Sequence, residues 1–201
     1  MDINKSKMDQ LNYEPSEGEE FLMDFFDWEG IDFIEQDVIN NLKGDSCTYR
    51  VADFYLPKYK VYVEFFGMWN LNELKKSEYR EKKKVYALND IPCIYLYPEN
   101  LGIIHYSFNK RMRVVLKKYN MKKELFKFNV KLLVENKGDS IVGFIFFLLL
   151  FILFQFDRKA EWFWQSCVVV GALSIYNAYG IVKGYMIFFK DEYSYVGFSR
   201  D

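Results

Sequence analysis

The 201-residue sequence predicts a mixed α/β domain that is followed by a hairpin of two apolar helices. Three features of the sequence predict this class. Short runs of β-branched and aromatic residues, separated by turn residues, indicate strands between residues 31 and 67 and again over 91–97. Segments with apolar residues at helical spacing lie before and between those runs. Two uncharged segments, 141–156 and 162–182, lie nearer the C-terminal end.

Composition excludes several classes of protein. The 27 basic and 28 acidic residues nearly cancel, so net charge says nothing about a nucleic-acid partner. Cys47, Cys93 and Cys167 are scattered and the chain has 1 histidine, so we expect a reducing compartment rather than a disulfide framework or a zinc site. Residues 1–15 are polar, and a loose tail without a signal peptide is expected there.

The first helix is predicted to begin after Ser16. Ser16 and Glu19 have the spacing of a capping box, in which each residue satisfies a backbone amide of the other. The apolar residues that follow recur at helical spacing, and the helix is expected to end near Gly30. A first strand is predicted over 31–38, and a turn over 40–48.

The central stretch, residues 50–67, predicts two adjacent strands that are joined by a tight turn at Pro57. Asp53 and Glu64 lie in these otherwise apolar runs. Because strand side chains alternate between faces, both carboxylates can point to the same side of the sheet. Two carboxylates that close repel each other unless a cation joins them, and oxygen ligands favour magnesium or manganese. The alternative is that both simply lie on the solvated face.

The next helix is predicted over 71–89, followed by the strand over 91–97. On a helical wheel, Lys83 lies nearly opposite the expected apolar stripe, and Lys84 lies on its flank. Lys82 lies at the margin of the stripe, from which it can reach the ends of the strands. The alternative for this lysine is a basic helix face that touches phosphates. The expected stripe consists of Leu71, Leu74, Val85 and Leu88.

The strands just described resemble the PD-(D/E)XK nuclease superfamily. In one branch of that superfamily the strands read Asp-Phe-Tyr-Leu-Pro and then Glu-aromatic-aromatic-Gly, as residues 53–57 and 64–67 do here. The proline that often precedes the aspartate is Ala52. The resemblance covers roughly residues 16–101 and implies a restriction-endonuclease-like core of helix, three strands, helix and strand, within a domain over 16–105.

The resemblance also implies the active-site residues. Asp53 and Glu64 would hold Mg²⁺, with Mn²⁺ as the alternative metal. The first helix would supply a third acid to the metal, and Glu19 is the candidate, with its capping role as the competing explanation. Phe66 stands where the family usually has its catalytic lysine. Some members take that lysine from the following helix instead, which points to Lys82.

Residues 106–139 are rich in lysine and arginine and are expected to form a basic connecting helix. Such a helix can contact the phosphates of a nucleic acid. The competing interpretation is a juxtamembrane segment held to anionic lipid, worth about 1 kcal/mol per basic residue near the surface. The two do not exclude each other.

Residues 140–183 are predicted to form a transmembrane hairpin, with a charged break over 157–161 and a short tail over 184–201. The segment 141–156 is slightly shorter than the about 20 residues that cross a bilayer, and 162–182 is long enough. Basic residues before the first span and after the second place both termini and the α/β domain in the cytoplasm. The alternative is a buried, soluble helical hairpin.

The function implied by these features together is a membrane-anchored, metal-dependent endonuclease that hydrolyses phosphodiester bonds, with DNA favoured over RNA. Four basic residues are expected to hold flanking phosphates: Arg50, Lys75, Arg80 and Lys83. Phe66 favours a different function, a catalytically inactive, membrane-tethered module that binds nucleic acid or another partner. Polar residues within the spans, such as Asn177, are candidates to bind a partner helix in the membrane.

Overall fold

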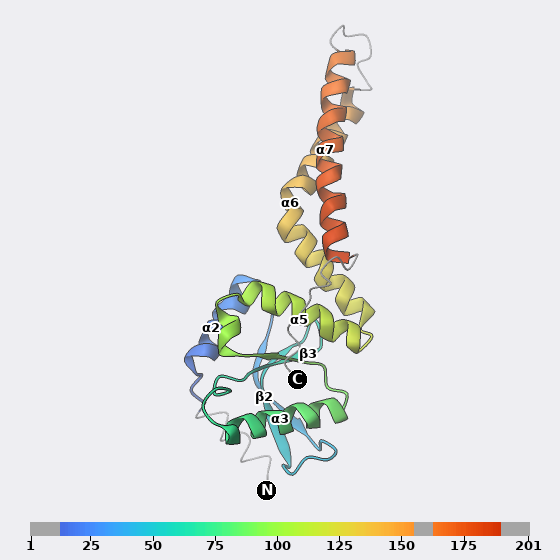
Figure 1. Ribbon diagram of the computed structural model, residues 1–201. Coiled ribbons are helices and arrows are strands. Elements are labelled where there is room, and N and C mark those ends of the chain that lie inside the picture. The colour runs from blue at the N-terminus through green and yellow to red at the C-terminus, as the bar shows by residue number, and fades with distance from the viewer. Residues whose placement is uncertain (1–12, 155–162, 190–201) are drawn as a thin grey trace. The chain divides into compact units, whose positions relative to one another are not determined.

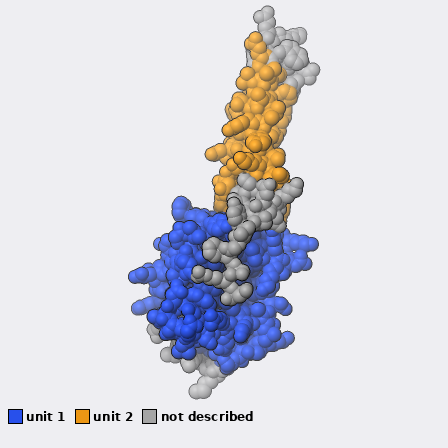
Figure 2. All heavy atoms as spheres, viewed as in Figure 1, with its two compact units in different colours: residues 1–125 blue, residues 126–201 orange. Residues whose placement is uncertain are grey.

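The computed structural model describes residues 13–154 and 163–189. The chain forms two compact units, residues 1–125 and 126–201, which are coloured separately in Figure 2 and described separately below. The expected charged break over 157–161 and most of the expected N-terminal tail lie outside the described residues.

The first unit is a mixed α/β domain, as the sequence predicts. Its elements follow the order helix, three strands, helix, strand, and two further helices complete it. The sheet has the order β1-β2-β3-β4, in which β3 and β4 are parallel and the other pairs are antiparallel. The elements are α2 (Glu17–Trp28), β1 (Ile34–Asn40), β2 (Tyr49–Leu56), β3 (Val61–Phe65), α3 (Glu73–Leu88), β4 (Cys93–Leu96), α4 (Pro98–Leu101) and α5 (Ile104–Lys118).

Helices cover both faces of this sheet (Figure 1). On one face, Phe26 of α2 packs edge-on against Phe54 of β2 and Phe108 of α5, and all three rings are buried. On the other face, Tyr86 of α3 is buried beside Cys93 of β4. The apolar core therefore lies mainly under α2 and α5, and the α3 face is left for more polar side chains.

The beginning of α2 is fixed by the expected capping box. The Ser16 backbone N–H donates to Glu19 Oε2 over 2.7 Å, and the Ser16 side chain accepts from the Glu19 backbone N–H. The helix ends at Trp28, close to Gly30, which has a φ of +58° that glycine adopts readily. The predicted start, cap and end of this helix are confirmed.

The apolar stripe expected on α3 is wrong for three of its four members. The side chains of Leu71, Leu74 and Leu88 are 66%, 68% and 62% exposed, and only Val85 is buried. The face of α3 that meets the sheet instead carries Tyr79, Lys82 and Tyr86. The physical reason is that the sheet presents carboxylates to this helix, so polar and aromatic side chains are the better partners.

The expected connecting helix is divided between two helices, α5 and α6 (Lys122–Phe154). Asn120 has a left-handed φ of 54°, and the Met121 N–H donates to the Leu116 carbonyl over 2.8 Å, an arrangement that ends α5. Within α6, Lys137 departs from helical geometry, with φ −133° and ψ 16°, so the helix is kinked there.

The second unit consists of most of α6 and all of α7 (Phe163–Phe189). Two helical segments, Lys122–Leu153 and Cys167–Met186, are long and apolar enough to cross a membrane. The two helices approach closely at glycines: a Cβ at Gly180 would lie 2.8 Å from Ser140 Oγ. Because α7 continues to Phe189, the first part of the expected C-terminal tail is helical, and residues 190–201 lie outside the described residues.

Candidate active site

The two central carboxylates come from neighbouring strands. Tyr55 of β2 pairs with Tyr62 of β3, and their rings lie 4.7 Å apart on one face of the sheet. Asp53 lies two residues before Tyr55, and Glu64 lies two residues after Tyr62, so the same antiparallel register brings both acids to that face. Asp53 Oδ2 also accepts a hydrogen bond from the Phe65 backbone N–H over 2.6 Å.

Helix α3 supplies the partners of Glu64, which is only 1% exposed. Lys82 Nζ lies 2.5 Å from Glu64 Oε2 and also donates to the Val51 carbonyl over 2.8 Å. The Tyr86 hydroxyl donates to Glu64 Oε1 over 2.8 Å. Lys82 and Tyr86 are one helical turn apart, so a single face of α3 holds both oxygens of the carboxylate. The structure thus brings together Asp53, Glu64 and Lys82.

The electrostatics of the cluster favour binding of a cation. Burial and the neighbouring charge of Glu64 raise the pKa of Asp53 well above its usual value, although Lys82 opposes this. Burial also raises the pKa of Glu64, against the effect of the Lys82 ammonium. Burial lowers the pKa of Lys82, but the two carboxylates outweigh it and leave that pKa raised. One ammonium therefore does not fully stabilise two carboxylate charges in this site, and a cation bound to Asp53 and Glu64 would favour their charged forms.

Glu19 contributes to the site in a different way from the one expected. Its Oε2 accepts hydrogen bonds from both the backbone N–H and the hydroxyl of Ser16, each over 2.7 Å. Its charge is among the causes that raise the pKa of Asp53, though the weakest of them. Within residues 13–154 and 163–189, no three histidine, cysteine or acidic side chains are close enough to share a metal ion. The capping role of Glu19 is confirmed, and its role at the metal remains a prediction.

The donor atoms nevertheless fit a divalent cation. Magnesium is commonly held by one or two carboxylates and keeps several of its waters. A carboxylate has about four lone-pair sites, so Glu64 can accept from Lys82 and Tyr86 and still offer an oxygen. Asp53 and Glu64 therefore form an adequate pair of oxygen ligands.

Two of the expected phosphate-binding residues are paired with acids. Arg50 forms two hydrogen bonds with Asp45, over 2.7 and 2.6 Å, and lies 3.2 Å from Glu81. Lys75 Nζ lies 2.7 Å from Glu78. The pairing of Arg50 ties the turn after β1 to α3, so a structural role explains this residue without a phosphate.

The other two expected phosphate-binding residues lie over aromatic rings. The Lys83 amine is 5.4 Å from the ring centroid of Tyr95, which differs from the fully solvated position expected for it. The Arg80 guanidinium is 5.7 Å from the ring centroid of Trp69, and 55% of its side chain is exposed. Of the four candidates, Arg80 is the one whose charge is best placed to meet a ligand from solvent.

Sequence reasoning missed the role of Tyr86. Its spacing of four residues after Lys82 was the available signal, because residues at that spacing share a helix face. The substitution at Phe66 also has a structural explanation. Phe66 is fully buried and stacks on Tyr79 with ring centroids 4.1 Å apart and an interplanar angle of 12°. Phe66 is thus part of an aromatic cluster, and the amine that meets Glu64 comes from Lys82 of α3.

We compared the chain with known proteins. No protein-family model, no curated protein and no solved structure matches it. The features that indicate a function are therefore those of the site itself: a buried Glu64 and a half-buried Asp53 on adjacent strands, with one lysine and one tyrosine from the helix that follows them.

Proposed function

We propose that the first unit is a metal-dependent nuclease that hydrolyses phosphodiester bonds, in DNA rather than RNA, and that the second unit anchors it in a membrane. The observation that carries this proposal is the meeting of Asp53, Glu64 and Lys82 from β2, β3 and α3. The element order and the strand pairing fit the restriction-endonuclease-like core that the sequence resemblance implies.

Asp53 and Glu64 would hold Mg²⁺ or Mn²⁺, with the Phe65 carbonyl as a further candidate ligand. When bound, the metal supplies a lowered pKa for a coordinated water and charge neutralisation on the phosphate. Asp53, with its raised pKa, would release any proton that it carries on binding the cation. Tyr86 and Lys82 together hold the Glu64 carboxylate in one orientation.

Lys82 acts as a charge rather than as a base in this proposal. Its raised pKa keeps the amine protonated at neutral pH. An ammonium held in a buried site can stabilise the negative charge that develops on the phosphate in the transition state. Its hydrogen bond to the Val51 carbonyl and its contact with Glu64 fix its position before any substrate arrives.

The second unit fits a membrane anchor, because α6 and α7 each contain a segment of sufficient length and apolarity. By the positive-inside rule, the basic residues before the first segment and Lys183 near the end of the second place both ends of the hairpin in the cytoplasm. The nuclease domain would then act on cytoplasmic nucleic acid.

The test is cleavage of plasmid DNA by the full-length protein in detergent micelles, with and without Mg²⁺. We expect Mg²⁺-dependent cleavage that Asp53→Ala and Lys82→Met each reduce by about a thousandfold or more. Lys84→Met, which changes an exposed lysine of the same helix, is the control and should keep full activity. Equal cleavage by the wild type and Asp53→Ala would overturn the proposal. Binding without cleavage would favour the inactive, membrane-tethered module.

A further inference from the structure

Three large apolar side chains are exposed in the connection between β3 and α3 and in the first turn of α3. Met68, Leu71 and Leu74 are 54%, 66% and 68% exposed and lie within seven residues of one another. A group of exposed apolar side chains often marks a surface that contacts another molecule. This segment directly follows Glu64 in the chain and leads into the helix that carries Lys82.

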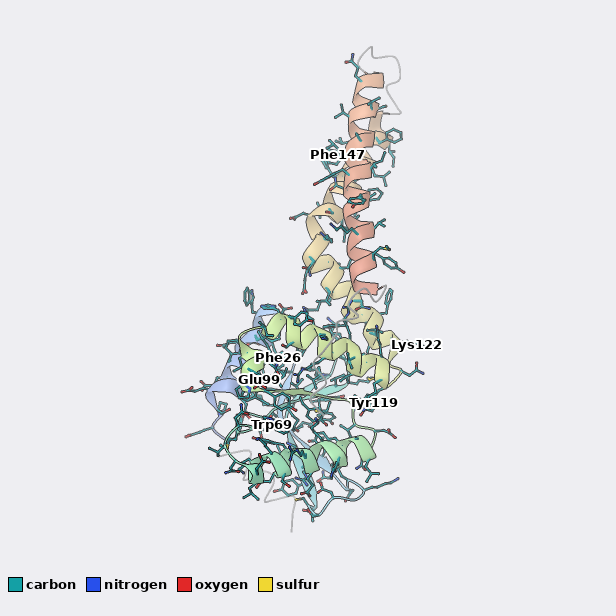
Figure 3. The ribbon with its side chains drawn as sticks, viewed as in Figure 1. Phe26, Trp69, Glu99, Tyr119, Lys122 and Phe147 are labelled. Atoms are coloured by element: carbon teal, nitrogen blue, oxygen red, sulfur yellow. The ribbon has the colours of Figure 1, made fainter. Side chains whose placement is uncertain are left out.

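Trp69 lies at the centre of the same segment, as labelled in Figure 3. Its half-buried ring is stacked with Phe66 and Tyr79, at centroid distances of 6.2 and 6.3 Å and interplanar angles of 11° and 23°. The Arg80 guanidinium lies over the Trp69 ring. Arg80 also forms an ion pair with Glu73 over 3.8 Å, a distance that is too long for a hydrogen bond.

A series of stacked rings connects this surface with the carboxylates. Phe66 comes two residues after Glu64 and stacks directly on Tyr79, and Tyr79 comes three residues before Lys82 on α3. Trp69 and Arg80 are therefore held by the same strand and helix that position the acid and the amine. The charges of Asp53 and Lys82 both act on the pKa of the Tyr79 hydroxyl, so this series of rings lies near the candidate site.

We propose that Trp69 and Arg80 form a stacking platform for an unpaired nucleobase, and that the substrate is single-stranded or locally unpaired nucleic acid. This inference rests on the proposed nuclease function. Aromatic rings bind bases without regard to sequence, and arginine adds a cation–π contact and a charge for the adjacent phosphate. Exposed apolar side chains such as Leu71 can contact the faces of bases that are no longer stacked. Bases inside an intact duplex do not offer these faces.

The test measures binding by the full-length protein in detergent micelles, with EDTA present to prevent cleavage. The probes are a fluorescently labelled oligothymidine strand and its duplex with oligoadenosine, followed by anisotropy. We expect Trp69→Ala to weaken binding of the single strand about tenfold while duplex binding is unchanged. Trp69→Phe should retain most of the affinity, because it keeps a ring. Trp28→Ala removes a tryptophan that is 81% exposed on α2 and should change neither affinity.

Arg80→Ala tests the inference even if Trp69→Ala misfolds, because the Arg80 side chain is mostly exposed and its loss leaves the stacked rings in place. It should also weaken binding of the single strand. The inference is overturned if Trp69→Ala and Arg80→Ala both bind the single strand as tightly as the wild type does. It is also overturned if the substitutions weaken binding of the single strand and of the duplex equally. If either result is obtained and the protein still cleaves plasmid DNA in Mg²⁺, the platform is overturned and the nuclease proposal is retained. Trp69-dependent binding without any cleavage would support the platform and overturn the nuclease.

Discussion

The two units satisfy their internal polar groups in opposite ways. In the first unit, Glu64 depends on Lys82 and Tyr86, which come from another element of the fold. In the second unit, Ser174 Oγ donates to the Val170 carbonyl over 2.9 Å, and Asn177 Nδ2 donates to the Leu173 carbonyl over 2.8 Å. Both of these bonds lie within α7 and form whenever the helix forms.

The difference fits the functions that we propose for the two units. A helix in hydrocarbon must satisfy its polar groups internally, because no water is present to do so. A site that binds a cation instead needs a cluster of charges that several elements of the fold hold together and that is not completely neutralised. The polar groups of the first unit should therefore be sensitive to the loss of a partner, and those of the second to the loss of close helix packing.

The largest effect is expected from Lys82→Met. The substitution keeps the length of the side chain but leaves Glu64 buried without its counter-charge. Breaking a buried ion pair from one side costs about 3–5 kcal/mol in the free energy of unfolding. Urea unfolding of the full-length protein in detergent, followed by near-ultraviolet circular dichroism, measures it. Lys84→Met should cost almost nothing, and Glu64→Gln combined with Lys82→Met should recover much of the loss. A cost below about 1 kcal/mol for Lys82→Met would contradict the ion pair.

Tyr86→Phe should have the next largest effect. It removes one hydroxyl and keeps the buried ring, so the loss reports the hydrogen bond to Glu64. A hydrogen bond to a charged group contributes about 1.5–3 kcal/mol to stability. The same urea measurement applies, and Tyr106→Phe, at a tyrosine that is 45% exposed, is the control. Equal stability of the two variants would show that the Tyr86 hydroxyl is not bonded to the acid.

The sequence predicted the acids and the amine of this site for partly different reasons from those that the structure gives. Alternation along two strands placed Asp53 and Glu64 correctly, because the strand period is local information. Lys82 was selected from its position beside an apolar stripe, and most of that stripe is exposed. Lys82 nevertheless faces the sheet, because Val85, the stripe member that is buried, fixes the orientation of the same turn of helix.

Other features were beyond sequence reasoning for physical reasons. The pairing of Arg50 with Asp45 and Glu81 depends on how the turn after β1 folds back towards α3, and side-chain periodicity does not describe turns. The spacing of Tyr86 from Lys82 does not by itself reveal its role, because its hydroxyl becomes important only when a buried carboxylate lies opposite it. No proline or glycine lies beside the left-handed Asn120 that separates α5 from α6, so the strongest sequence signals for a helix end are missing there.

Asp53→Asn should stabilise the protein in the absence of divalent cations, and by more at higher pH. Because the folded-state pKa of Asp53 is raised, the folded state binds more protons than the unfolded state above about pH 4. The free energy of unfolding of the wild type therefore falls as the pH rises from the unfolded pKa through the folded one. Asparagine mimics the neutral acid and removes this part of the decline, so the gain in the free energy of unfolding grows as the pH rises towards 8.

Urea unfolding at pH 5 to 8 in EDTA measures this pH dependence. Added Mg²⁺ should stabilise the wild type and have a much smaller effect on Asp53→Asn, because the variant lacks one carboxylate ligand. Parallel pH profiles for the two proteins would show that the pKa of Asp53 is the same in the folded and unfolded states. The fold would then not hold Asp53 and Glu64 close enough to repel each other, and the first unit would not depend on tertiary structure to hold its charges.

The smallest expected effect lies in the second unit, where packing replaces charge. A Cβ at Gly180 would lie 2.8 Å from Ser140 Oγ, whereas a Cβ at Gly171 of the same helix would meet no atom within 4 Å. Gly180→Leu should therefore separate α6 from α7 and cost about 1–2 kcal/mol, and Gly171→Leu should not. The midpoint of unfolding by sodium dodecyl sulfate in mixed micelles measures the difference. If both variants have the wild-type midpoint, close approach at Gly180 does not hold the two helices together, and local satisfaction of polar groups would be all that the second unit requires.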